Sequence, residues 1–195
     1  MTEATQALID AGRALDQRGW VPATSGNFSV RLDEGDLAIT ASGNHKGHLR
    51  PEHIMQIGSD GQPRDAKRPS AETDLHLQLY RREPAVAAVL HTHSVGATIA
   101  SMEQQPALEF SGLEIVKAFA PIKTHETTVS IPVFPNSQDI DQLAADVDEY
   151  MTRNGTGFAY LIRGHGLYTW GENVEECLRH LEALEFLFEY HRLAR

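Results

Sequence analysis

Two histidines stand two positions apart after a short apolar run, His91 and His93. Residues two apart on an extended chain point to the same side, so both imidazoles can face one ion at the end of a strand. Neutral imidazole is a common zinc ligand, and a catalytic zinc usually keeps three protein ligands and one open position. Two histidines alone are equally compatible with a polar turn between a strand and a helix.

A third histidine, His165, lies between Gly164 and Gly166, directly after a second apolar run at residues 159–162. Glycine permits backbone angles that other residues avoid and allows close approach of another group. The alternative is a glycine-rich turn with an exposed histidine. Because two histidine-bearing turns follow two candidate strands, we expect a zinc site formed by His91, His93 and His165.

Two segments rich in small and hydroxyl-bearing residues, 24–29 and 40–46, are candidates for binding a phosphate group. Open backbone N–H groups, hydroxyls and a lysine all donate to phosphate oxygens. Neither segment matches the Walker pattern, and each could be an ordinary turn. Ser70 could donate to the same anion or only cap the helix that follows it. The predicted phosphate-binding residues are Ser25, Gly26, Asn27, Ser42, Gly43, Lys46 and Ser70.

Two carboxylates, Glu72 and Glu114, are candidates for moving protons. Glu72 lies near a predicted helix start, where the helix dipole favours an acid in any case. Glu114 stands between Leu113 and Ile115. If its carboxylate is buried there, its pKa would rise toward neutrality and suit general acid–base catalysis. An exposed charge is the alternative for both residues.

The elements that must position these side chains follow from apolar periodicity and turn residues. Strands and helices mix without strict alternation, which favours an α/β sandwich with a mainly antiparallel sheet. With no internal repeat or linker, residues 1–195 form one predicted domain. We expect helices over 3–18, 70–82, 94–103, 138–153 and 174–193, and strands over 28–31, 37–40, 85–91, 129–134, 157–162 and 168–170.

Composition excludes several classes of protein. A formal net charge of −10 argues against general nucleic-acid binding, which depends on neutralising phosphates with Lys and Arg. No apolar run approaches the length of a membrane span. The N-terminal segment lacks the pattern of a signal peptide, and a single cysteine, Cys177, suits a reducing compartment. We expect a cytoplasmic protein that binds neither nucleic acid nor membrane.

Taken together, these segments resemble the class II aldolase/adducin family. The resemblance follows the chain in order, through residues 24–29, 40–46, 70–73, 91–94 and 164–171. It implies the class II aldolase-like sandwich, with a central mainly antiparallel sheet flanked by helices. It also implies one zinc ion per subunit, a small phosphorylated ketose as substrate, and a homotetramer of fourfold symmetry with sites near subunit interfaces.

Within the family, segments 91–94, 113–118 and 163–171 resemble members that dehydrate a phosphorylated ketose. In those members the acid that matches Glu114 is the proposed acid/base, whereas related aldolases use the acid that matches Glu72. Having both leaves the division of roles open. Sugar-phosphate aldol cleavage and 4-epimerisation remain alternatives on the same scaffold. A non-catalytic, adducin-like interaction domain is disfavoured because all three histidines are present.

Overall fold

The computed structural model describes residues 2–194, in which eight strands form one sheet. The strand order is β3-β2-β1-β4-β8-β7-β6-β5, and all neighbouring pairs are antiparallel except β6 and β7. The strands are β1 (Asn27–Arg31), β2 (Leu37–Thr40), β3 (Ile54–Ile57), β4 (Ala88–Thr92), β5 (Ala107–Phe110), β6 (Val129–Phe134), β7 (Ala159–Ile162) and β8 (Gly166–Gly171).

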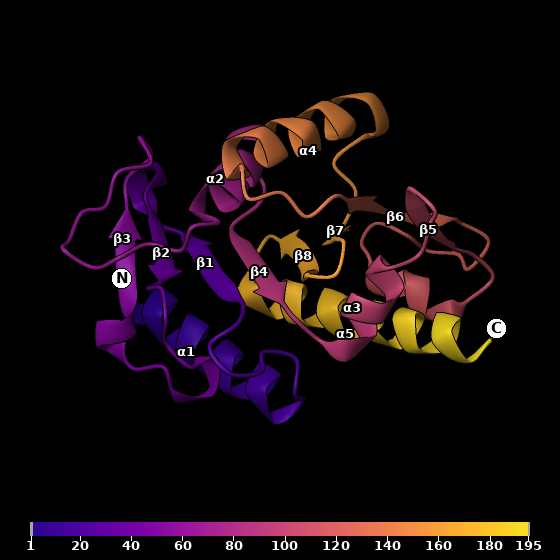
Figure 1. Cartoon of the computed structure of the whole chain (residues 1–195), viewed down its shortest axis with the longest axis horizontal. Coiled ribbons are helices and arrows are strands. Elements are labelled where there is room, and N and C mark those ends of the chain that lie inside the picture. Colours follow the sequence, from indigo (N-terminus) through magenta and orange to yellow (C-terminus); the bar gives the residue numbers. More distant parts are fainter. Residues whose placement is uncertain (1, 195) are drawn as a thin grey trace.

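Five α-helices cover the two faces of this sheet in the described part of the chain (Figure 1). Side chains alternate between the faces along each strand, so Leu90 packs into one apolar cluster and Val89 into the other. The first cluster joins α1 (Thr2–Gln17), α3 (Val95–Ser101) and α5 (Val174–Leu193) to the sheet. The second joins α2 (Thr73–Arg82) and α4 (Ile140–Asn154) to the opposite face. The predicted sandwich is therefore confirmed.

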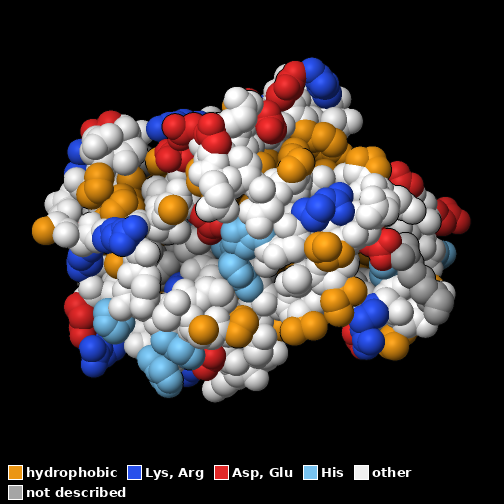
Figure 2. Space-filling model, in the orientation of Figure 1, with side chains coloured by type: hydrophobic (Ala, Val, Ile, Leu, Met, Phe, Trp, Pro, Cys, Tyr) orange, Lys and Arg blue, Asp and Glu red, His pale blue; other side chains and the backbone are white. Residues whose placement is uncertain are grey.

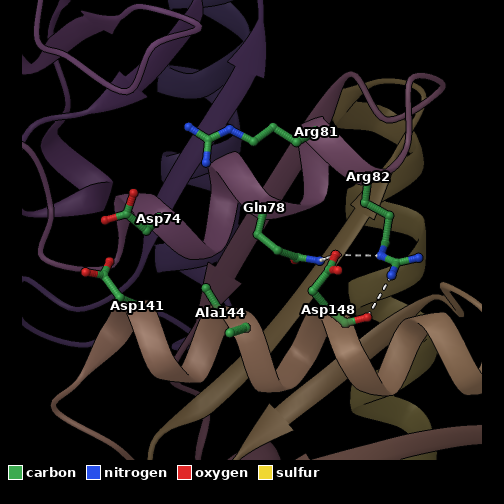
Figure 3. Close-up of a pocket in the computed structure, with 8 residues that line it drawn as sticks. Asp74, Gln78, Arg81, Arg82, Asp141, Ala144 and Asp148 are labelled. Atoms are coloured by element: carbon green, nitrogen blue, oxygen red, sulfur yellow. Dashed lines mark hydrogen bonds and ion pairs between the residues drawn. The ribbon is translucent and has the colours of Figure 1, made fainter.

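Helices α2 and α4 are also tied to each other by polar contacts. Asp148 on α4 accepts hydrogen bonds from Gln78 Nε2 at 2.9 Å and Arg82 Nε at 2.8 Å, as Figure 3 shows. The three residues lie along a groove of about 600 Å³ between the two helices. The groove contains neither the candidate histidines nor the candidate phosphate loops, so the site with catalytic potential lies elsewhere.

Most predicted elements are present, and the bounds predicted for β2, β6 and α5 match those of the structure. The prediction that Ser70 caps α2 is wrong. Glu72 occupies the N-cap position of α2, and Ser70 Oγ instead accepts from the backbone N–H of Glu72 at 3.3 Å. Ser94, in contrast, caps α3 as predicted and accepts from Ala97 N. No helix among residues 2–194 is long and apolar enough to cross a membrane.

Candidate active site

Strand register brings the site together at one end of the central strands. Asn27 on β1 pairs with His91 on β4, and His91 pairs in turn with Tyr168 on β8. His93 lies just beyond β4, and His165 lies in the turn between β7 and β8. Three histidines from two distant parts of the sequence therefore meet, with their candidate ligand atoms all within 4.8 Å of one another. Figure 2 shows histidine side chains near the centre of the face of the molecule that it draws.

Hydrogen bonding prepares His91 to bind a metal through Nε2. Its Nδ1 lies 3.0 Å from the carbonyl oxygen of Leu167, and because a carbonyl only accepts, Nδ1 carries the proton. Nε2 is then unprotonated and lies 2.8 Å from Nε2 of His93. Burial lowers the pKa of His91 well below its usual value and that of His93 to about 4. Both rings are therefore neutral at physiological pH, as metal ligands must be.

Glu72 adds a carboxylate to the three imidazoles. Its Oε1 lies 3.0 Å from His165 Nε2, and its Oε2 lies 3.4 Å from His91 Nε2. Burial alone would raise the pKa of Glu72, but nearby His91, His165 and Asn27 hold it well below its ordinary value. An ionised carboxylate beside three imidazoles is a donor set that fits a divalent transition-metal ion.

The two small-residue loops open on the same space as this cluster. A cavity of about 230 Å³ is lined by all seven residues predicted to bind phosphate, together with Glu72, His93 and His165. Gly26 has a positive φ of 75°, and a Cβ there would lie 2.6 Å from the carbonyl oxygen of His91. Only glycine fits at this position, because the first loop passes so close to β4.

Lys46 is the cation of this cavity. It is only 2% exposed, and its ammonium group donates to the carbonyl oxygens of Thr24 at 2.9 Å and Asn44 at 2.7 Å. An ammonium group has three N–H bonds, so one remains for a ligand. Burial lowers its pKa to about 8. A bound anion would compensate for the charge that Lys46 carries in this desolvated position.

The side chain of Asn27 makes hydrogen bonds within the protein. Its Nδ2 donates to Glu72 Oε2 at 2.7 Å and to Ser70 Oγ at 3.3 Å. Its Oδ1 contacts Nε2 of His76. The amide thus already has partners at both ends and serves the carboxylate beside the histidines. Direct contact of Asn27 with phosphate stays a prediction.

Of the two alternatives for Glu114, a buried carboxylate or an exposed charge, the single chain has the exposed charge. Residues Glu114–Ala118 form a short 3-10 helix, in which Val116 is buried while the side chain of Glu114 is 70% exposed. Glu114 contacts Lys117 at 2.5 Å and His125 at 3.4 Å. Lys117 is the main cause of a lowered, not raised, pKa of Glu114. Neighbours in sequence point in different directions on a helix, so flanking Leu113 and Ile115 do not desolvate the carboxylate.

Sequence reasoning missed two residues beside Glu72. Tyr168 donates its hydroxyl to Glu72 Oε2 at 3.1 Å, and its ring stacks on His91 with centroids 4.0 Å apart. His76 is fully buried, and its ring contacts Asn27 and Ser29. One signal was available for His76: it follows Glu72 by four positions, so both lie on one helix face.

Comparison with known proteins agrees with this architecture. Residues 6–191 match the model of the class II aldolase and adducin N-terminal domain, so the chain belongs to that family of α/β sandwiches. Among its relatives, methylthioribulose-1-phosphate dehydratase of Methylococcus capsulatus is 54% identical over 93% of this chain and 89% of its own. The protein of the same name from Marinobacter nauticus is 50% identical over 95% of this chain and 91% of its own.

Solved structures with this fold include several aldolases. The l-fuculose-1-phosphate aldolase of Thermus thermophilus has a TM-score of 0.77 and 28% identity, covering 99% of this chain and 97% of its own. YgbL of Escherichia coli has a TM-score of 0.84 and 26% identity, covering 98% and 89%. The fold is therefore shared by enzymes that catalyse different reactions. The choice between a dehydratase, an aldolase and an epimerase depends instead on the dehydratases that are 54% and 50% identical to this chain.

Proposed function

We propose that the chain is a zinc-dependent hydro-lyase that converts 5-methylthioribulose 1-phosphate to 5-methylthio-2,3-dioxopentyl phosphate, a step of methionine salvage in the cytoplasm. The observation that carries the proposal is the shared cavity, in which a metal-binding histidine cluster faces two phosphate-type loops. Identity of about half the residues with dehydratases across nearly the whole chain supports this particular reaction.

The chemistry requires removal of a proton from C3 of the substrate, next to the C2 ketone. The resulting enediolate expels the C4 hydroxyl as water, and the enol product ketonises to the 2,3-diketone. Bound zinc would act as a Lewis acid that stabilises the negative charge developing on the substrate oxygens. His91, His93 and His165 would hold the ion, while the two loops and Lys46 would bind the phosphate. Anchoring the remote phosphate fixes the reacting carbon relative to the proton-transfer groups.

Glu114 and Glu72 are the proposed proton-transfer groups, with Glu114 the principal one. Glu72 already faces the cavity. Glu114 lies on an exposed segment, so it would reach a substrate in the cavity of another subunit within an assembly. This arrangement agrees with the proposed homotetramer with sites near subunit interfaces.

The direct test is incubation with 5-methylthioribulose 1-phosphate followed by mass spectrometry. The proposal requires a product lighter by one water. The second candidate function is aldol cleavage or 4-epimerisation, favoured by the position of Glu72 beside His165 at 3.0 Å. Cleavage would yield two fragments, and epimerisation would leave the mass unchanged while altering the product stereochemistry. Either outcome, with no dehydrated product, would replace the dehydratase assignment.

Lys46→Ala should raise KM for the phosphorylated substrate by about 10- to 100-fold, which corresponds to about 1.4–2.8 kcal/mol of lost charge-assisted hydrogen bonding. Lys67→Ala, which removes an exposed ammonium paired with Asp65, is the matched control and should leave KM unchanged. Because the pKa of Lys46 is about 8, the lysine is charged below that pH and loses its charge above it. KM of the wild type should therefore rise above pH 8, and this rise should vanish in Lys46→Ala. Equal effects of the two lysine substitutions would exclude Lys46 from the site.

An exposed apolar stripe supports the proposed homo-oligomer. Helices α3 and α5 pack together, and each carries a set of three exposed apolar side chains. Within each set the second residue follows the first by four positions, and the third follows the second by three. Exposed fractions of the six residues run from 46% to 72%. A surface of this kind is typical of a protein–protein contact. The stripe consists of Val95 and Ile99 on α3, Met102 at the C-cap of α3, and Phe186, Tyr190 and Leu193 on α5.

Met102→Glu should therefore shift the assembly toward smaller species in sedimentation or light scattering, because a charge would be buried in the contact. Turnover should fall with it, since α3 begins immediately after His93 and Ser94. Ala145→Glu places the same charge on the opposite layer, on exposed α4, and should leave the assembly intact. An unchanged oligomer in Met102→Glu would remove this stripe from the interface.

A further inference from the structure

Helix α2 and strand β1 are joined side by side by a ladder of polar side chains. Glu72, His76 and Tyr80 are four positions apart, and Asn27 and Ser29 on β1 are two apart. Four helical residues advance about 6 Å, and two strand residues advance about 6.6 Å. The two spacings match closely enough for successive side chains of the helix to meet successive side chains of the strand.

The contacts of this ladder form one continuous chain. Glu72 is bonded to Asn27, whose oxygen contacts His76 Nε2. His76 Nδ1 lies 2.7 Å from Ser29 Oγ, which lies 2.9 Å from the hydroxyl of Tyr80. Ser29 and His76 are completely buried, and Tyr80 is 5% exposed. The partners of His76 and Ser29 are therefore shielded from solvent.

The direction of every hydrogen bond in this series of side chains follows from Glu72, its first member. The carboxylate of Glu72 only accepts, so Asn27 must turn its NH2 toward it and its carbonyl oxygen toward His76. That oxygen requires a proton on Nε2 of His76. In the neutral ring Nδ1 is then an acceptor, which takes the hydroxyl proton of Ser29, and Ser29 Oγ accepts from Tyr80.

Burial lowers the pKa of His76 to about 4, so the ring is neutral in the working range. The facing groups include Glu72, which alone would raise that pKa, and the hydroxyls of Ser29 and Tyr80. The ring of Tyr168 also packs edge-on against His76 at 5.7 Å. A neutral ring in a single tautomer can hold the amide of Asn27 in one orientation.

We propose that His76 is a positioning residue that fixes the Asn27 amide and, through it, the carboxylate of Glu72. Asn27 and Tyr168 both donate to Oε2, which anchors that oxygen on the sheet side. Oε1 receives neither of these bonds and faces His165 at 3.0 Å, whereas Oε2 lies 3.4 Å from His91 Nε2. The ladder thus determines which oxygen of Glu72 is offered to a metal or substrate. This inference deepens the proposed function and rests on it for the role of Glu72 in turnover.

Three substitutions at His76 separate positioning from simple packing. His76→Leu removes both nitrogen atoms and should lower kcat and zinc affinity by about 10- to 100-fold, as is typical for groups that orient metal ligands. His76→Gln keeps an N–H at the position of Nε2 and should restore most of both. His76→Asn is too short to reach Asn27 and should resemble His76→Leu. KM should change less than kcat in all three, because Lys46 and the second phosphate loop are not part of the ladder.

Gln78→Leu is the matched control, since Gln78 is a buried polar residue of the same helix that faces α4 instead (Figure 3). It should lower the melting temperature without lowering zinc affinity. Melting temperatures of the His76 variants verify that each is folded. If folded His76→Gln is as impaired as His76→Leu, or if neither differs from wild type, the positioning role is refuted.

Measurements on the metal-free protein keep this inference separate from the proposed function. In ¹⁵N-histidine NMR spectra, the ring of His76 should remain neutral and protonated at Nε2 between about pH 5 and 8, where ordinary histidines titrate. That signal should disappear in His76→Leu. If the wild type fails to dehydrate the substrate while zinc affinity and the NMR signal follow the predicted pattern, the proposed function fails and the positioning role stands. An Nδ1–H tautomer or a charged ring would overturn the inference alone.

Discussion

The His91→Ala, His93→Ala double variant should bind no stoichiometric zinc and should show no measurable turnover. Two of the three imidazoles that lie within 4.8 Å of one another would be lost, leaving only His165 and the carboxylate of Glu72. Catalytic zinc sites usually have three protein ligands, so two donors hold the ion too weakly. Metal content after dialysis, measured by elemental analysis, checks the first result, and the dehydration assay checks the second.

His48→Ala is the control for this experiment. His48 is exposed, its ring stacks on that of His45 at 4.6 Å, and it is not part of the group of three histidines that could hold a metal. Its loss should leave zinc content and turnover unchanged. Retention of one zinc per chain by the double variant would show that the metal, if present, is bound elsewhere.

Glu114→Gln should lower kcat by about 100- to 10,000-fold, the usual contribution of a general acid–base group, while zinc content stays normal. Glutamine keeps the size and polarity of the side chain but cannot take up a proton. Glu72→Gln should instead weaken zinc binding, because both oxygens of Glu72 contact metal-site histidines, at 3.0 and 3.4 Å. Glu109→Gln, an exposed acid on edge strand β5, is the control.

The exposed position of Glu114 permits a sharper version of this test. His93→Ala subunits lack the metal site but carry Glu114, whereas Glu114→Gln subunits carry the metal site. If Glu114 acts on a neighbouring subunit, co-assembly of these two inactive variants should restore part of the turnover. Without any restoration, Glu114 would have to act within its own chain or not at all.

The single substitutions have a contrary outcome as well. Near-normal kcat in Glu114→Gln, with Glu72→Gln inactive but metal-loaded, would assign the base to Glu72 and reopen the aldolase alternative.

The parts of the fold that sequence predicted are those with strong local patterns. The candidate histidines could be found because they follow apolar runs that are central strands, and the two loops because small residues gather there. Strands β3 and β5 were missed. Each is four residues long and lies at an edge of the sheet, so it has one neighbouring strand and a short apolar pattern.

Side-chain direction was harder to predict than the position of elements. The apolar neighbours of Glu114 suggested burial, but a 3-10 turn points its carboxylate outward. The environment of Glu72 depends on residues from β1, α2, β4 and β8, whose contacts arise from register and not from local sequence. No pattern within one segment states that Asn27 and His76 face each other.

The register that aligns Asn27, His91 and Tyr168 also determines when the site can exist during synthesis. Strand β4 pairs with β8, and His165 lies just before β8, far along the chain from His91 and His93. A nascent chain that has not yet released β8 from the ribosome has only two of the three histidines in place and lacks the strand that supports His91. Long-range pairing of this kind forms late. The arrangement of three histidines that could hold a metal ion is therefore complete only once β8 has paired with β4 at the centre of the sheet.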